Sequence, residues 1–189
     1  MRVVTVTLES VSPYSQSRFY KPECSTLEQQ KETKDATEAR TWRERCHTTA
    51  EGHLFMPPMA FKNCLSEAAR FLSVQIPGKG KTTYTKHFEA GVLVMEGIVL
   101  PETKDTVKGE WLHVPSDGRR GGGKRVEKCF PVVHAWKGDV TFHILDETIS
   151  REVFEQHIRE AGNFIGVGRF RPRNNGFYGR FKVVKVVWG

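Results

Sequence analysis

The sequence predicts an α+β domain in which an antiparallel sheet carries two helices and two long insertions interrupt the core. Three observations predict it. Apolar residues alternate in several short stretches, recur at helical spacing in two others, and are sparse in two segments, residues 12–55 and 102–128. The 189 residues allow one sizeable core, so we expect a single domain over residues 1–189.

The first strand and the first insertion occupy residues 2–55. Residues 2–8 alternate as a strand should, and Val4, Val6 and Leu8 share the face that we expect to be buried. Ser, Thr, Glu, Gln and Lys then dominate residues 12–55, which we interpret as a long, partly mobile insertion with a helical turn near residues 38–45.

The first helix is predicted to begin at Pro57–Pro58, because proline is tolerated in a first helical turn. Apolar residues follow at helical spacing, namely Phe61, Leu65, Ala68, Ala69 and Leu72. After a basic linker, residues 91–100 are apolar enough to predict a strand buried on both faces.

The second insertion, residues 102–128, contains the glycine triplet Gly121–Gly123, which excludes a stable helix in its middle. Residues 140–144 alternate again, and a second helix is predicted from the N-cap Ser150 to Gly162. Residues 181–188, rich in valine and aromatic residues, predict the last strand. The resulting order is that of a ferredoxin-like (RRM-like) split βαβ core.

Composition excludes several classes of function. No apolar run is long enough to span a membrane, and the N-terminus resembles no export signal, so we expect a cytoplasmic protein with reduced thiols. The four cysteines and seven histidines show no metal-ligand spacing, and residues 78–83 lack the first glycine of a nucleotide-binding loop. We therefore expect no cofactor. The net charge of +7 favours a polyanionic partner.

Residues 163–189 contain six basic residues and no acidic residue. Glycines there would let the backbone approach a phosphate and expose successive N–H groups, arginines would make bidentate contacts, and aromatic rings would stack on unpaired bases. The same rings would otherwise pack in the core of a solvated hairpin. The candidate nucleic-acid contacts in this segment are Gly166, Gly168, Arg169, Phe170, Arg171, Arg173, Gly176, Phe177, Tyr178, Gly179 and Arg180.

A second basic cluster flanks the glycine triplet, as expected of a flexible finger that grips a strand, although a charged, disordered loop has the same composition. Its candidate residues are Arg119, Arg120, Lys124 and Arg125, and Lys62 in the first helix is a further candidate contact.

Three segments resemble a known family. Gly-Val-Gly-Arg-Phe-Arg-Pro (166–172), together with Gly-Phe-Tyr-Gly-Arg-Phe (176–181), resembles the C-terminal glycine-rich loop of the RAMP superfamily of CRISPR-associated proteins. Residues 57–65 and 3–13 are similar to the first loop-to-helix segment and the opening strand of its backbone subunits. The resemblance implies a ferredoxin-like core that binds guide RNA, stacks beside its own copies, and uses residues 102–128 as a protruding thumb.

The function predicted on these grounds is sequence-independent binding of single-stranded RNA, without catalysis, by a homo-oligomer or a subunit of a ribonucleoprotein complex. Two alternatives stay open. RAMP endoribonucleases use a histidine of the N-terminal half without a metal ion, a role that His47 or His53 would fill here. An interaction protein that mimics or inhibits a CRISPR complex would preserve the same surface.

Overall fold

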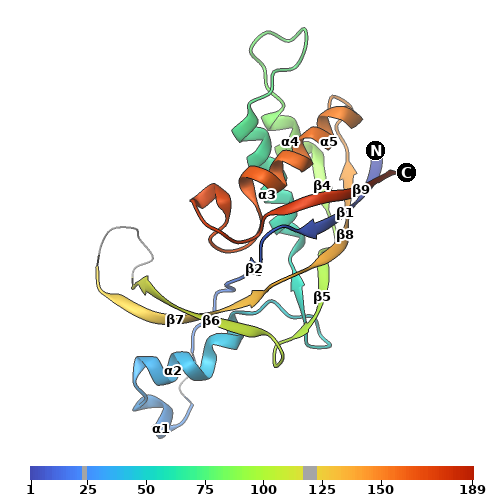
Figure 1. The fold of residues 1–189 in the computed structure, drawn as a ribbon. Coiled ribbons are helices and arrows are strands. Elements are labelled where there is room, and N and C mark those ends of the chain that lie inside the picture. Colours follow the sequence, from blue (N-terminus) through green and yellow to red (C-terminus); the bar gives the residue numbers. More distant parts are fainter. Residues whose placement is uncertain (23–24, 117–122) are drawn as a thin grey trace.

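The computed structural model describes residues 1–22, 25–116 and 123–189. The chain has mixed α and β structure with antiparallel sheets, and it is elongated (Figure 1). A four-stranded sheet with its helices forms one end, and a β-hairpin with a short helix forms the other. Within the described residues, no helix is long and apolar enough to cross a bilayer.

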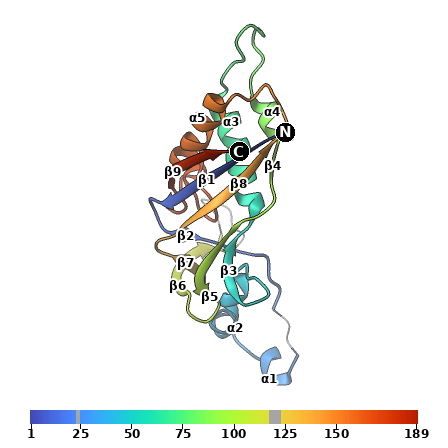
Figure 2. The ribbon, with the colours of Figure 1, turned by 90° about the vertical axis from the view of Figure 1, so that its right-hand side faces the viewer.

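The main sheet contains β1 (Arg2–Ser10), β4 (Val92–Val94), β8 (Lys137–Ile144) and β9 (Phe181–Trp188) in the order β4-β8-β1-β9. Each neighbouring pair is antiparallel. The helices α3 (Pro58–Leu72) and α5 (Arg151–Glu160) cover one face of this sheet, and the other face is turned toward the viewer in Figure 2.

The core lies between the sheet and these helices. Val4, Val6 and Leu8 are fully buried, which confirms the alternation predicted for the first strand. Helix α3 begins at Pro58 and buries Phe61 and Leu65, as its apolar spacing predicted. Strand β9 has the predicted bounds, and the Ser150 side chain caps α5 by accepting a hydrogen bond from the Val153 N–H.

The two insertions pack together at the other end of the molecule. Most of the remaining elements lie within these insertions or border them: β2 (Tyr14–Ser15), α1 (Leu27–Gln30), α2 (Lys34–Thr41), η1 (Trp42–Arg45), β3 (His53–Met56), β5 (Ile98–Thr103), β6 (Lys108–Pro115) and β7 (Arg125–Val133). Strands β2, β7 and β6 form a second antiparallel sheet, and the buried Glu38 of α2 accepts a hydrogen bond from the Cys129 N–H at 2.9 Å while it pairs with Arg45. The insertions therefore form a second packed unit.

Two boundaries differ from the prediction. Residues 91–100 are not one strand, because Gly91 ends helix α4 (Thr85–Gly91), β4 stops at Val94, and β5 pairs with β3 in another sheet. A side chain at Gly97 would collide with the Met56 carbonyl oxygen at 1.8 Å, so the chain turns away there. The second helix does not stop at Gly162 but continues as the π-helix η2 (Ala161–Ile165).

Candidate nucleic-acid interface

Residues 166–180, here called the glycine loop, fold against the connection between β1 and β2. Gly166, Gly168 and Gly179 have φ values of 72°, 82° and 79°, which other residues rarely adopt. A Cβ atom at Gly179 would lie 1.8 Å from the Val167 carbonyl oxygen, and one at Gly168 would lie 2.3 Å from the Ser15 carbonyl oxygen. These glycines therefore allow the loop to pack on itself and on β2.

The N–H groups of the glycine loop serve this packing. The Val167, Arg169 and Gly179 N–H groups donate to the carbonyl oxygens of Gly179, Ser15 and Pro13 at 2.7 to 3.0 Å. The prediction that the loop offers successive free N–H groups to a phosphate is wrong for these positions, because the fold itself uses them.

Arg169 has the most unusual environment in the loop. Its guanidinium carbon lies 3.6 Å from the centroid of the Phe130 ring on β7 and 5.6 Å from that of Tyr178. Its Nε and Nη2 atoms are buried and have no hydrogen-bond partner in the structure. Burial lowers the pKa of the guanidinium, and the proximity of Tyr178 and Glu110 opposes that effect. Unpaired buried donors are costly, so these nitrogens are suited to an incoming acceptor.

The other basic side chains divide into two groups. Arg171 forms a half-buried ion pair with Glu67 of α3, at 2.7 Å. The Lys62 ammonium donates to Ser66 Oγ and to the Phe88 and Glu89 carbonyl oxygens of α4, so its hydrogen bonds hold two helices together. Arg173 is exposed, with its guanidinium carbon 5.6 Å from the centroid of the Phe71 ring.

The aromatic candidates differ in accessibility. Tyr178 is only 7% exposed, and its hydroxyl donates to Glu110 on β6. Burial and Glu110 raise the pKa of Tyr178 to about 12. Its predicted role as a stacking platform is wrong for this conformation, because its ring packs inside the protein. Phe170 and Phe177 are 44% and 58% exposed and can reach a ligand.

The second basic cluster lies on the β6–β7 hairpin. Lys124 and Arg125 are exposed where β7 begins, whereas Arg119 and Arg120 lie outside the described residues. Phe130, against whose ring the Arg169 guanidinium lies, follows Arg125 by five residues on the same strand. At 3.4 Å per residue, the two residues are about 17 Å apart. The hairpin thus connects the two predicted basic clusters.

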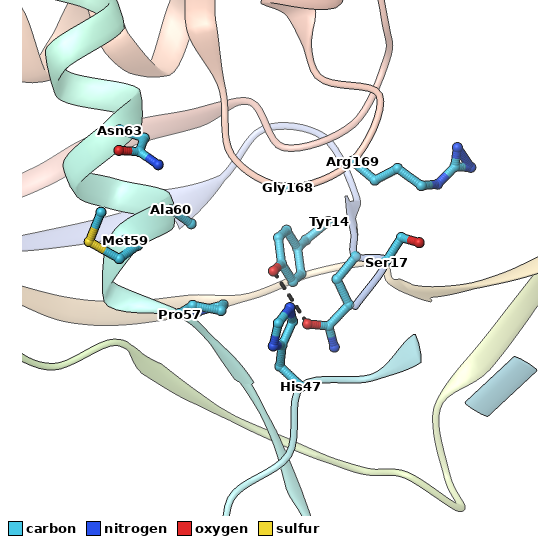
Figure 3. A pocket seen from close by; sticks show the side chains of 10 residues that line it. Tyr14, Ser17, His47, Pro57, Met59, Ala60, Asn63, Gly168 and Arg169 are labelled. Carbon is cyan, nitrogen blue, oxygen red and sulfur yellow. Dashed lines mark hydrogen bonds between the residues drawn. The ribbon is translucent and has the colours of Figure 1, made fainter. Parts of the chain in front are cut away.

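A pocket of about 410 Å³ opens beside the glycine loop (Figure 3). It joins four segments that are far apart in the sequence: residues 14–17, residue 47, residues 57–63 and residues 168–169. The Gln16 side chain, which is 3% exposed, lines the pocket, and its Nε2 atom has no hydrogen-bond partner in the structure. The Arg169 side chain points away from the other lining residues in Figure 3.

His47 also lines this pocket, and its ring lies edge-on to Phe55 with centroids 5.9 Å apart. Burial, reinforced by the charge of Arg18, lowers the pKa of His47, so the imidazole is neutral at pH 7. The other histidine candidate, His53, does not line the pocket, and its Nδ1 is buried without a partner in the structure.

Among the residues that the structure describes, no cluster of His, Cys, Asp or Glu is arranged to hold a metal ion. Cys46, Cys64 and Cys129 are buried free thiols, and Cys24 lies outside the described residues.

Comparison with known proteins yields a structural likeness only. No family model matches the sequence, and no curated protein does. A chain in a cryo-EM structure of the type III-B Cmr-beta bound to cognate target RNA matches 99% of this chain with a TM-score of 0.53 and 10% identity. The two share a fold. This chain covers 60% of the length of that one. Cmr6 from Pyrococcus furiosus also matches, over 96% of this chain and 97% of its own, with 13% identity and a TM-score of 0.47.

Sequence reasoning identified part of this site. It pointed to His47, Gly168 and Arg169, which line the pocket. It also pointed to the hairpin, whose strand β7 contacts Arg169 through Phe130. It missed Tyr14, Gln16, Ser17 and Asn63, which line the pocket. Nothing distinguishes these four residues from ordinary polar residues in the sequence, because the pocket exists only once the four segments meet.

Proposed function

We propose that this protein binds single-stranded RNA without sequence preference, along the glycine loop and the β6–β7 hairpin, as a RAMP-like subunit of a multi-subunit ribonucleoprotein. On this proposal the main sheet with α3 and α5 is a ferredoxin-like split βαβ core. The strand order β4-β8-β1-β9, with α3 before β4 and α5 before β9, supports that assignment.

The environment of Arg169 carries the proposal. The guanidinium is held against Phe130 and keeps two buried nitrogens without acceptors in this structure. A fold gains nothing from leaving such donors unpaired, whereas a phosphate oxygen would satisfy them with charge-assisted hydrogen bonds. Because the cation is already desolvated and fixed, little side-chain entropy would be lost when a strand binds.

The neighbouring side chains supply the other parts of a single-strand interface. Arg173, Lys124 and Arg125 are exposed cations that would contact phosphates on either side of Arg169. Phe170 and Phe177 present exposed ring surface on which unpaired bases would stack. Both kinds of contact ignore base identity, which is the reason for proposing binding without sequence preference.

The likeness to a chain of an RNA-bound type III-B Cmr-beta structure supports a role inside an assembly of CRISPR type. On the proposal, the chain works in the cytoplasm beside copies of itself or other subunits and performs no chemistry of its own. The second packed unit, built from the two insertions, would provide a surface for such neighbours.

A charge-removing substitution tests the proposal. Arg169→Met keeps an unbranched side chain over Phe130 but removes the cation, and it should weaken binding of an unstructured oligonucleotide by about tenfold or more. The negative slope of log K against log salt should become shallower by about 0.7.

The matched control is Arg159→Met, which changes the net charge equally at an exposed ion pair on α5. Fluorescence anisotropy across a salt series measures both variants. If Arg169→Met binds as the parent does, or if Arg159→Met weakens binding as much, the glycine loop is not the RNA interface.

A further inference from the structure

One side of the pocket beside the glycine loop is formed by the start of helix α3, which is the positive end of the helix dipole. Pro57, Met59, Ala60 and Asn63 at the start of this 15-residue helix line the pocket. In this described segment, no side chain caps the helix and no acidic residue occupies its first turn. The helix therefore directs the positive end of its dipole at the cavity, although Pro58 has no N–H group and the Ala60 N–H donates to the Pro57 carbonyl oxygen at 2.9 Å.

An independent feature on the other side of the pocket also requires an acceptor. The Gln16 amide is almost completely buried, its Oε1 lies 3.5 Å from the Tyr14 hydroxyl, and its Nε2 donor is unpaired in the structure. Buried amide donors are nearly always satisfied in folded proteins, so a ligand oxygen is the expected partner of this one.

The remaining wall of the pocket suits an anion as well. None of the described residues that line it is acidic. Gly168 brings the glycine loop so close to Tyr14 and Ser15 that no side chain fits there. His47 is neutral at pH 7 because its pKa is lowered, and a bound anion would favour its protonated form.

We propose that this pocket is a phosphate subsite, in which a phosphate group of an RNA chain sits at the N-terminus of α3 and accepts a hydrogen bond from Gln16 Nε2. The inference rests on the proposed RNA binding and refines it. Arg169 also lines the pocket, but its side chain points away from the other lining residues to Phe130 of β7, so a strand that contacts both would pass along the Gly168–Arg169 segment. The phosphate is either the end of a strand or an internal phosphodiester, and the experiment separates these sources.

Two substitutions remove the subsite in different ways. Gln16→Leu deletes the unpaired donor and should weaken phosphate binding; it also removes the acceptor of the Tyr14 hydroxyl, so its Tm is measured alongside as a check of folding. Met59→Glu places a carboxylate at the exposed pocket rim, where it interacts favourably with the helix dipole but repels a phosphate. Met59→Gln has nearly the same side-chain size without the charge, so the difference between Met59→Glu and Met59→Gln isolates the effect of the carboxylate.

Binding is measured by fluorescence anisotropy on one short oligonucleotide with a 5′-phosphate, a 3′-phosphate or hydroxyl ends. A strand-end subsite predicts that one terminal phosphate improves parental affinity about tenfold, and that this gain disappears in Gln16→Leu and Met59→Glu. An internal subsite predicts no gain from an end phosphate, but about tenfold weaker binding of all three oligonucleotides to both variants. If all three bind both variants as they bind the parent, the subsite is refuted while RNA binding stands.

A second experiment uses inorganic phosphate alone, so that the subsite is tested even if the protein binds no RNA. At constant ionic strength, replacing chloride by phosphate should raise the Tm of the parent and of Met59→Gln more than that of Gln16→Leu and Met59→Glu. Equal shifts in all four proteins, without RNA binding, would refute both the subsite and the proposed function.

Discussion

Replacing Gly168 by alanine tests how the glycine loop is held in place. Two costs add at this position. The backbone has φ of 82°, where an L-residue costs about 1–2 kcal/mol, and the new Cβ would lie 2.3 Å from the Ser15 carbonyl oxygen and 2.5 Å from the Tyr14 ring. Overpacking of this kind costs about 1–3 kcal/mol more, so Gly168→Ala should lower the free energy of unfolding by about 2–5 kcal/mol.

Gly78→Ala is the matched control, because Gly78 has φ of 75° but nothing within 4 Å of a new Cβ. It should cost only the backbone part, about 1–2 kcal/mol. Urea unfolding followed by circular dichroism measures both variants, and the difference between them isolates the collision with β2. In a chain of this size, each kcal/mol corresponds to about 2–4 °C in Tm. Equal losses in the two variants would mean that the loop does not press against β2 as the structure shows.

Three further outcomes are expected. His157 is buried against Phe88, its Nδ1 donates to the Val153 carbonyl, and burial lowers its pKa. The unfolded chain therefore binds more protons below about pH 6.5, so the urea midpoint should fall as pH drops from 7 toward 5, and His157→Phe should flatten this dependence. End-labelled RNA should stay intact during prolonged incubation in EDTA or Mg²⁺, and EDTA-resistant cleavage lost in His47→Ala would favour the endoribonuclease. Replacing residues 116–125 by a short Gly-Ser linker should leave Tm nearly unchanged but reduce RNA-dependent assembly in sedimentation velocity, and undiminished assembly would count against a role for the hairpin tip.

The parts of the fold that sequence predicts well are those with strong local periodicity. Strand β1 buries every second residue and α3 buries one stripe, so their patterns reflect the final burial directly. The prediction of one strand over residues 91–100 was wrong, because a continuous apolar run does not reveal that the chain passes from one sheet to another at Gly97. That break depends on the Met56 carbonyl, a contact 41 residues away in sequence.

The candidate site shows the same limit for function. Composition treats every arginine and lysine of the basic segments alike, but the fold assigns Arg171 to Glu67 and Lys62 to the end of α4. The Arg169 side chain, in contrast, keeps buried donors without acceptors. Whether a cation is neutralised within the protein is a property of distant contacts, so the sequence can locate the loop but not rank its arginines.

Arg169 and the Gln16 pocket together constrain the path of a bound strand. Both present buried donors without acceptors in the structure, and the Arg169 side chain leaves the pocket lining at Gly168, where the chain packs closely on Tyr14 and Ser15. From Phe130, against which the Arg169 guanidinium lies, strand β7 runs about 17 Å to Arg125. An RNA that satisfied the pocket, Arg169 and the hairpin in turn would run from the start of α3 across the glycine loop toward the second packed unit. Losses from Gln16→Leu and Arg169→Met should therefore fall below additivity in the double variant, because displacing the strand from one contact weakens its hold on the other.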